Sequence, residues 1–259
     1  MSTTYPGVLP RPQRSGYHIS AAAMATATAR DRTVPRCRRI GLAPVYVVSL
    51  TWIFTVEQFA VFCGWWRYDL AQGSALAQII LMNGFDDITY VRFLCPYQAE
   101  DLDGKWKVSV QAELPTYPRM SQAALEALIP GGSATPYLPA WPVAYLGQVL
   151  RAGNSRSPVD RSARASLAAG PQVARQRHHH LLDACPIAIN FTDAQLTAFD
   201  AWWFYFLNQG TAWFTLTLLG ENDAETHKAR VNGGYQAAAE AGNKWHVTMK
   251  LDLDDPPHA

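Results

Sequence analysis

The chain contains an internal repeat, and this feature restricts its possible folds more than any other. Residues 55–73 and 192–210 align without a gap and are identical at nine positions. The identical positions include two adjacent tryptophans, Trp65-Trp66 in the first copy and Trp202-Trp203 in the second. A tryptophan pair that recurs in one frame indicates that a structural unit has been copied in tandem.

The flanks of the repeat place the domain boundaries. Lys105-Trp106 in the first copy corresponds to Lys244-Trp245 in the second, in the same order after the tryptophan pair. We therefore predict a first domain over residues 1–115 and a second over residues 141–259. Residues 116–140 are rich in proline and glycine and predict a linker that contains a short helix.

Each copy predicts the same local structure. A β-branched and aromatic run precedes Thr55, and such runs favour strands. The pattern Thr-x-x-Gln at 55–58 and at 192–195 is a capping box, which starts a helix. Gly73 and Gly210 then end the two helices.

The end of each copy predicts a half-buried strand. Apolar residues alternate with polar residues from Trp106 to Leu114 and from Trp245 to Leu253. This alternation is typical of an antiparallel sheet with one solvated face. The predicted fold class is mainly β, an antiparallel sandwich or barrel with one inserted α-helix in each of two tandemly duplicated domains.

The formal net charge of +1 conceals two opposite charge regions. Residues 1–40 and 141–180 hold thirteen arginines and two aspartates, a net of +11, and we expect these regions to form extended arms. The other residues hold nine basic and nineteen acidic side chains, a net of −10. Arginine suits paired contacts with carboxylates, so the arms are predicted to dock on acidic surfaces of neighbouring subunits. A solvated basic loop and direct contact with DNA are the alternatives. The proposed contact arginines are Arg36, Arg38, Arg39, Arg175 and Arg177.

The two tryptophans of each pair point about 100° apart on a helix, so they are expected to differ in role. Trp66 and Trp203 fall on the apolar helical face and are assigned to the core. Trp65 and Trp202 are predicted to lie at a contact between domains or between subunits.

The sequence predicts no enzyme and no bound cofactor or metal. It lacks a phosphate-binding loop and the Gly-x-Ser-x-Gly turn of hydrolases. Of His178-His179-His180, only His178 and His180 could share a metal in a strand, and an exposed strand start is the preferred interpretation. The uncharged stretches 40–56 and 201–220 contain polar residues or proline, and neither is interpreted as a membrane span.

The order of these signals resembles the small tail proteins of tailed bacteriophages, of the minor tail and distal-tail type. The residues that carry the resemblance are the Arg36–Arg39 cluster, the segment 55–73, Val91-Arg92-Phe93 and Gly104–Val108. The second copy departs from the pattern at Ala229-Arg230-Val231 and through an apparent insertion at 220–243.

The resemblance implies a non-enzymatic virion protein of the tail or the head-to-tail neck, present in the host cytoplasm during assembly. Such a protein would form rings of identical subunits and would dock to other tail or neck proteins. The alternative is a tail-associated module that binds a receptor or a carbohydrate through aromatic side chains of the second domain, with Trp202, Trp213 and Tyr235 as candidates.

Overall fold

The strands with the strongest alternation in the sequence lie in one mixed sheet, which has eleven strands among the described residues. The structure is a computed structural model. It describes residues 2–22, 25–28, 36–41, 43–82, 88–129, 138–149, 162–165, 173–176, 182–219 and 224–254.

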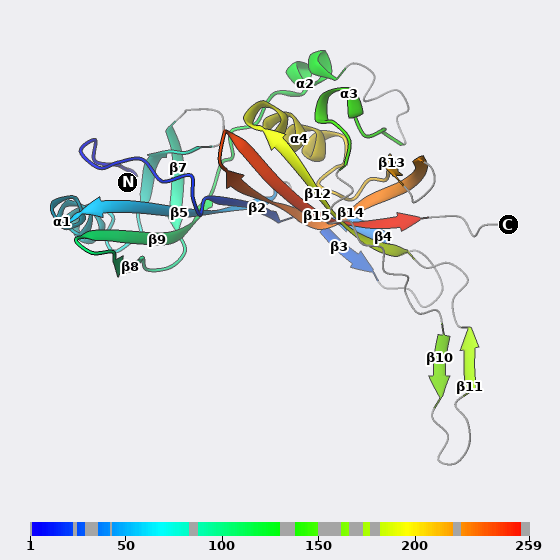
Figure 1. The fold of residues 1–259 in the computed structure, drawn as a ribbon, viewed down its shortest axis with the longest axis horizontal. Helices are drawn as coiled ribbons and strands as arrows, with labels where there is room; N and C mark the ends of the chain where they lie inside the picture. Colours follow the sequence, from blue (N-terminus) through cyan, green and yellow to red (C-terminus); the bar gives the residue numbers. More distant parts are fainter. Residues whose placement is uncertain are drawn as a thin grey trace.

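The elements divide into two halves that follow each other along the chain (Figure 1). The N-terminal half contains β1 (Ser2–Thr4), β2 (His18–Ala22), β3 (Ala25–Thr28), β4 (Arg36–Arg39), β5 (Val45–Thr55), α1 (Val56–Gly64), a π-helical turn (Trp65–Asp69), β6 (Leu76–Ile80), β7 (Ile88–Phe93), β8 (Gln98–Asp101) and β9 (Lys105–Leu114). The intervening segment holds α2 (Gln122–Leu128). The C-terminal half contains α3 (Val143–Leu146), β10 (Ser162–Ala165), β11 (Val173–Gln176), β12 (Asp183–Thr192), α4 (Asp193–Tyr205), β13 (Phe214–Leu219), β14 (Ala224–Glu240) and β15 (Lys244–Asp254).

Both predicted capping boxes are present and start α1 and α4. The Thr55 hydroxyl accepts a hydrogen bond from the backbone N–H of Gln58, and the Gln58 side chain accepts one from the backbone N–H of Thr55. Thr192 and Gln195 make the same reciprocal pair. The box satisfies N–H groups that a helix start otherwise leaves without partners.

The turn after each helix has the same unusual backbone conformation. Gly73 and Gly210 have left-handed φ angles of 88° and 85°. They do not themselves end the helices as predicted, because the caps are Leu70 and Phe206. The two residues before each glycine are also left-handed, with φ angles of 46° and 61° in the first turn and 47° and 60° in the second. Left-handed non-glycine residues are uncommon, so two matching pairs show that both turns follow one path.

The strand order is also the same in the two halves. In the N-terminal half the order across the sheet is β6-β7-β9-β5, and in the C-terminal half it is β13-β14-β15-β12. The sheet is not purely antiparallel as predicted, because β1 pairs with β6 in parallel. Ala140 makes the corresponding parallel bridge to Thr215 on β13.

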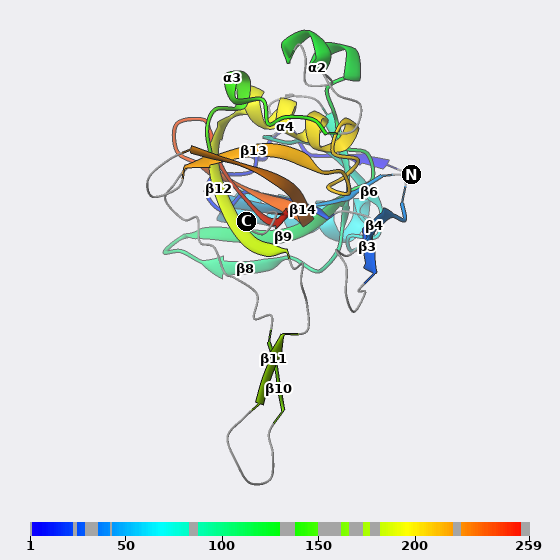
Figure 2. The ribbon, with the colours of Figure 1, turned by 90° about the vertical axis from the view of Figure 1, so that its right-hand side faces the viewer.

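Two small hairpins repeat at the same spacing as the helix motif. In β3–β4, Ala25 pairs with Arg39, and in β10–β11, Ser162 pairs with Gln176. Each residue of the second hairpin lies 137 positions after its counterpart, as Thr192 does after Thr55. The β10–β11 hairpin stands away from the main sheet (Figures 1 and 2).

The two halves join through β2, which the sequence had placed in an extended arm. β2 pairs with β5 on one side and with the C-terminal part of β14 on the other. The apparent insertion at 220–243 is largely β14 itself, a strand of 17 residues that reaches the other half. A Cβ on Gly234 would lie 1.6 Å from the carbonyl oxygen of Ala21, so only glycine lets the two strands approach this closely.

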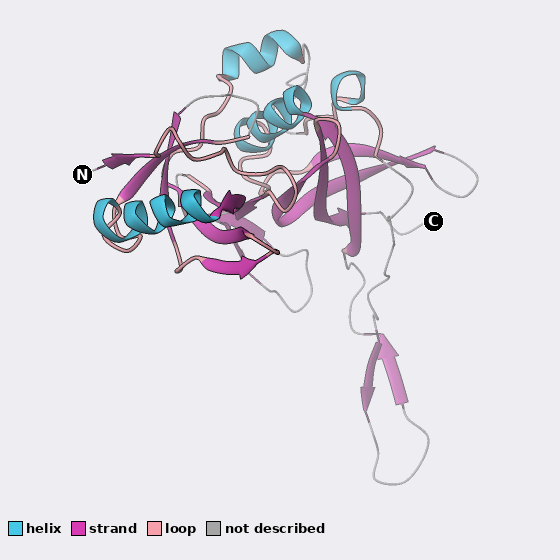
Figure 3. Ribbon diagram, turned by 60° about the vertical axis from the view of Figure 1, so that its left-hand side comes forward, coloured by secondary structure: helices cyan, strands magenta, loops and turns pink. Residues whose placement is uncertain are grey.

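The helices cover the two halves differently. In Figure 3, α1 lies along one end of the molecule, away from the other helices, whereas α2 and α3 lie close to α4 (Figures 1 and 2).

Trp66 and Trp203 are buried as predicted, and one continuous hydrophobic core runs through both halves.

Candidate functional site

Buried polar side chains meet where the two halves join. Asp200 on α4 is 1% exposed, and its carboxylate accepts hydrogen bonds from three donors. The hydroxyls of Tyr46 on β5 and Tyr235 on β14 donate to Oδ1, the second at 2.7 Å. Nε of Arg119, from the segment before α2, donates to Oδ2 at 2.8 Å. The carboxylate thus connects both halves and the segment between them.

Further contacts fix the geometry of this network. The Arg119 guanidinium also donates to the Tyr46 hydroxyl at 2.6 Å and lies 3.7 Å from the ring centroid of Phe204. The Tyr117 ring stacks on Tyr46 with centroids 4.0 Å apart. A buried charge is stable only when it is paired and hydrogen-bonded, and Asp200 meets both conditions.

The electrostatics of the network favour a structural role. Burial, followed by the charge of Asp200, raises the pKa of Tyr46 and of Tyr235 far above the ordinary range. Burial alone would lower the pKa of Arg119, but the charges and hydrogen bonds of Asp200 and Tyr46 together more than offset it, and the pKa is raised. Proton transfer in catalysis needs a pKa near the working pH. These hydroxyls remain donors at neutral pH.

The N-terminal half has different chemistry at the same position. Cys63 lies eight residues after the Thr55 cap, as Asp200 lies eight residues after Thr192. The Cys63 sulfur is 3.4 Å from the hydroxyl of Tyr97, which is only half-buried. This hydrogen bond, and then burial, raises the pKa of Tyr97 to about 12.

A second contact between the halves centres on Arg14, one of the thirteen arginines in the predicted arms. Its guanidinium donates to the backbone carbonyls of Glu240 at 2.8 Å and Lys244 at 3.1 Å. It also lies 3.5 Å from the Asp193 carboxylate and 5.4 Å from the ring centroid of Trp245. Sequence proximity could not reveal this contact, because it joins residues more than 170 positions apart.

The proposed contact arginines have different surroundings. Arg38 is exposed on β4, and the neighbouring Arg39 donates to the side-chain oxygen of Asn208 at 2.8 Å. Arg39 therefore contacts the C-terminal half of its own chain. Arg36 lies on β4 and Arg175 on β11, whereas Arg177 falls outside the described residues.

The proposed contact tryptophans are covered by their own chain. Trp65 is 4% exposed, packs edge-on against Tyr5 and donates to the Thr4 carbonyl. Trp202 is 0% exposed and packs edge-on against Trp141. Both rings are covered by their own half of the chain, contrary to the prediction that they lie at a contact between domains or between subunits. Trp65 packs against the segment before the β3–β4 hairpin, and Trp202 packs against the segment before the β10–β11 hairpin.

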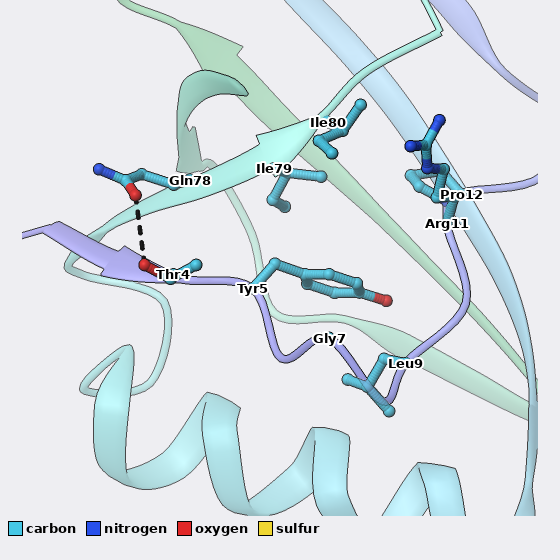
Figure 4. A pocket seen from close by; sticks show the side chains of 9 residues that line it. All are labelled: Thr4, Tyr5, Gly7, Leu9, Arg11, Pro12, Gln78, Ile79 and Ile80. Atoms are coloured by element: carbon cyan, nitrogen blue, oxygen red, sulfur yellow. Dashed lines mark hydrogen bonds between the residues drawn. The ribbon is translucent and has the colours of Figure 1, made fainter. Parts of the chain in front are cut away.

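A cavity of about 230 Å³ lies beside β1 and β6 (Figure 4). Its polar groups are already paired, since the Tyr5 hydroxyl donates to the Pro10 carbonyl at 2.7 Å and Thr4 bonds to Gln78 at 3.2 Å. Leu9, Ile79 and Ile80 make much of its wall apolar. The described lining residues contain no nucleophile paired with a base.

The part of the chain that the structure describes holds neither a cluster of metal-binding side chains nor a membrane-crossing helix. No group of three or more potential ligands gathers there, and His178–His180 lie outside the described residues. No described helix combines the length and the apolar character needed to cross a membrane.

Comparison with known proteins identifies no family for this chain. No protein-family model matches the chain, and no curated protein matches it.

Proposed function

We propose that this protein is a structural component of a bacteriophage virion, in the tail or the head-to-tail neck, that acts by self-assembly into rings. The proposal rests first on the resemblance of the first copy to small tail proteins. The observation that carries it furthest is the repeated arrangement of strands, hairpins and left-handed turns at matched positions of the two halves.

The repeated arrangement supports a tandem duplication of one β-rich unit, of sandwich or barrel type, with a helix inserted in each copy. In this proposal one chain supplies two similar positions in a ring. A ring of n chains would then present 2n similar units, which is one way to match a neighbouring ring of different symmetry. Other tail or neck proteins are the proposed neighbours.

A non-enzymatic role agrees with the chemistry of the junction. The most strongly perturbed side chains that the structure describes bind one another across the two halves, and their hydroxyls are locked as donors. A network of this kind stabilises one relative position of the halves. An assembly protein needs such rigidity, because each subunit must present its contact surfaces at a fixed angle.

The alternative of a receptor- or carbohydrate-binding module gains no specific support. Trp202 and Tyr235 are buried in the core. Trp213 is half-buried, and the charged groups of Lys228 and Arg230 lie 5.0 Å and 4.7 Å from its ring centroid. These rings therefore offer no open aromatic platform for a sugar.

The proposal is tested by two measurements on the full chain. Light scattering on the purified protein should give a discrete species larger than a monomer, and mass spectrometry should detect the chain in purified phage particles that carry its gene. A protein that stays monomeric at all concentrations and is absent from the particles would overturn the proposal.

A further inference from the structure

We infer that the β10–β11 hairpin of one chain docks on the outer face of β7 and β9 in a second copy of the chain, the sheet face that carries Arg92 and Glu113. This contact would repeat, between two chains, the contact that the β3–β4 hairpin makes with the C-terminal half of its own chain. The inference rests on the self-assembly proposed above and names one pair of surfaces that carries it.

The β3–β4 hairpin supplies the template, because it contacts the other half of its own chain. Arg39 on β4 donates to the side-chain oxygen of Asn208, which follows α4, at 2.8 Å. Burial raises the pKa of the Cys37 thiol on the same strand, the charge of Arg230 opposes this rise and the charge of Asp252 adds to it. The hairpin of the N-terminal half therefore reaches the C-terminal half where β14 and β15 pair.

The surface that this hairpin reaches holds a buried ion pair. Arg230 on β14 faces Asp252 on β15 and donates to its carboxylate at 2.8 Å. Arg230 is only 2% exposed, and its guanidinium lies 4.7 Å from the ring centroid of Trp213. The outer face of the C-terminal half is thus covered at the point of contact.

The same face of the N-terminal half is exposed. Arg92 on β7 faces Glu113 on β9, just as Arg230 faces Asp252 in the other half. In contrast to the buried Arg230, Arg92 is exposed and Glu113 is half-buried. Equivalent positions of the two halves therefore differ in what covers them.

Apolar side chains flank Arg92 on this face. Tyr90 and Leu94 lie two residues before and after it, and alternate residues of a strand share one face. The backbone N–H of Leu94 donates to the carbonyl of Gln111 on β9 at 2.9 Å, so the ladder extends to this residue. Tyr90 is 44% exposed and Leu94 is 50% exposed. Exposed apolar side chains gathered at one place favour a contact with another protein.

The β10–β11 hairpin is the matching occupant. Each of its residues lies 137 positions after its counterpart in β3–β4, so Ala174 corresponds to Cys37 and Arg175 to Arg38. The hairpin stands away from the main sheet (Figures 1 and 2), and among the described residues its two strands pair only with each other. The hairpin of the C-terminal half and the outer face of the N-terminal half are therefore the two surfaces that the template leaves unmatched within one chain.

The geometry of this contact determines the kind of assembly. It joins the C-terminal half of one chain to the N-terminal half of the next, so it is a head-to-tail contact and not a two-fold one. Head-to-tail contacts generate a ring when the rotation closes and an open filament when it does not. In a ring, the same hairpin contact would join each half to the next, both within chains and between them.

Photocrosslinking on the full chain tests where the hairpin docks. With p-benzoylphenylalanine in place of Ala174, irradiation should produce dimers on a denaturing gel, and mass spectrometry should locate the new bond in β7 or β9 of the second chain. The same amino acid in place of Cys37 is the matched control, and it should link to β14 or β15 without producing dimers. A bond from position 174 that stays within one chain, or that lies on another surface, would overturn the inference.

Two exposed leucines test the receiving face. Leu94→Glu places a charge in the contact and should raise the concentration needed for assembly, measured by light scattering, about tenfold or more, the effect of losing one buried leucine side chain. Leu102→Glu, at a leucine that is 42% exposed between β8 and β9, should leave this concentration unchanged. Both variants should keep the wild-type circular dichroism, because both side chains are exposed.

The outcomes separate the inference from the proposed function. Assembly of Leu94→Glu at wild-type concentrations, or an equal loss in both leucine variants, would overturn the inference alone. A wild-type chain that never assembles would overturn the proposed self-assembly together with it.

Discussion

Asp200 shows how one residue can connect the whole molecule. Its carboxylate holds Tyr46, Arg119 and Tyr235, which come from three separate parts of the chain. No local sequence pattern marks this residue, since it lies in the repeat at a position where the first copy has cysteine. The network could not be predicted because its members are separated by tens of residues and only the joined sheet brings them together.

Asp200→Asn tests this network. The substitution leaves the largely buried Arg119 without its counter-charge, and breaking a buried ion pair from one side costs about 3–5 kcal/mol. We expect a loss of this size in the free energy of unfolding, measured by urea denaturation. Asp69→Asn, at an exposed carboxylate after α1, is the control and should change stability by less than about 0.5 kcal/mol. Equal effects of the two substitutions would contradict the assignment.

The buried tyrosines predict a loss of stability in alkali. Burial raises the pKa of Tyr46, Tyr117 and Tyr235 in the folded protein above the unfolded value of about 10. The folded state therefore binds more protons, so its stability is complete below pH 10 and falls as the pH rises further. Denaturant titrations between pH 8 and about pH 12 should show this fall, and Tyr235→Phe should make it shallower. A free energy of unfolding that does not change across this range would contradict the prediction.

At the scale of elements, the two capping boxes give a matched pair within one chain. Thr55→Ala and Thr192→Ala should each lower the free energy of unfolding by about 1 kcal/mol, the usual effect of removing a helix N-cap. Thermal and urea denaturation should agree on the two values. Thr55→Ser keeps the hydroxyl and should remain close to wild type, whereas a loss as large as that of Thr55→Ala would exclude capping as the cause.

Gly234 is predicted to control the contact between β14 and β2. A Cβ at this position would meet the Ala21 carbonyl at 1.6 Å, and a backbone atom cannot move aside as a flexible side chain can. Gly234→Ala should therefore destabilise the protein by more than about 2 kcal/mol. Gly64→Ala, at a helical position with nothing within 4 Å, should instead stabilise it by about 0.5–1 kcal/mol.

Elements with strong local signals could be predicted, and those defined by distant pairing could not. The alternation of β9 and β15 and the caps of α1 and α4 appear in the structure at the expected residues. β2 was missed because its alternation covers only the five residues His18–Ala22, and its position depends on pairing with β5 and β14. The length of β14 was missed because Gly233-Gly234 looks like a turn, although here it marks a bulge and a close approach between strands.

At the scale of the whole molecule, the charge distribution matters more than the net charge. The arms and the remaining residues carry +11 and −10, and two arm arginines, Arg14 and Arg39, contact the C-terminal half within the chain. We propose that other arm arginines make similar contacts between chains. The exposed strand β8 carries two acidic side chains, Glu100 and Asp101, that such arginines could meet.

Assembly is therefore predicted to weaken with salt. Electrostatic interactions between exposed groups extend about 8 Å at physiological ionic strength and about 3 Å at 1 M salt, so 1 M NaCl should shift the protein toward smaller species in light scattering. Arg38→Gln removes an exposed arm charge and should reduce this salt dependence, because fewer ionic contacts remain to be screened. Arg67→Gln, at an exposed arginine after α1 and outside the arms, should leave it unchanged. An assembly unaffected by 1 M NaCl would show that contacts other than ionic ones hold the chains together without the arms.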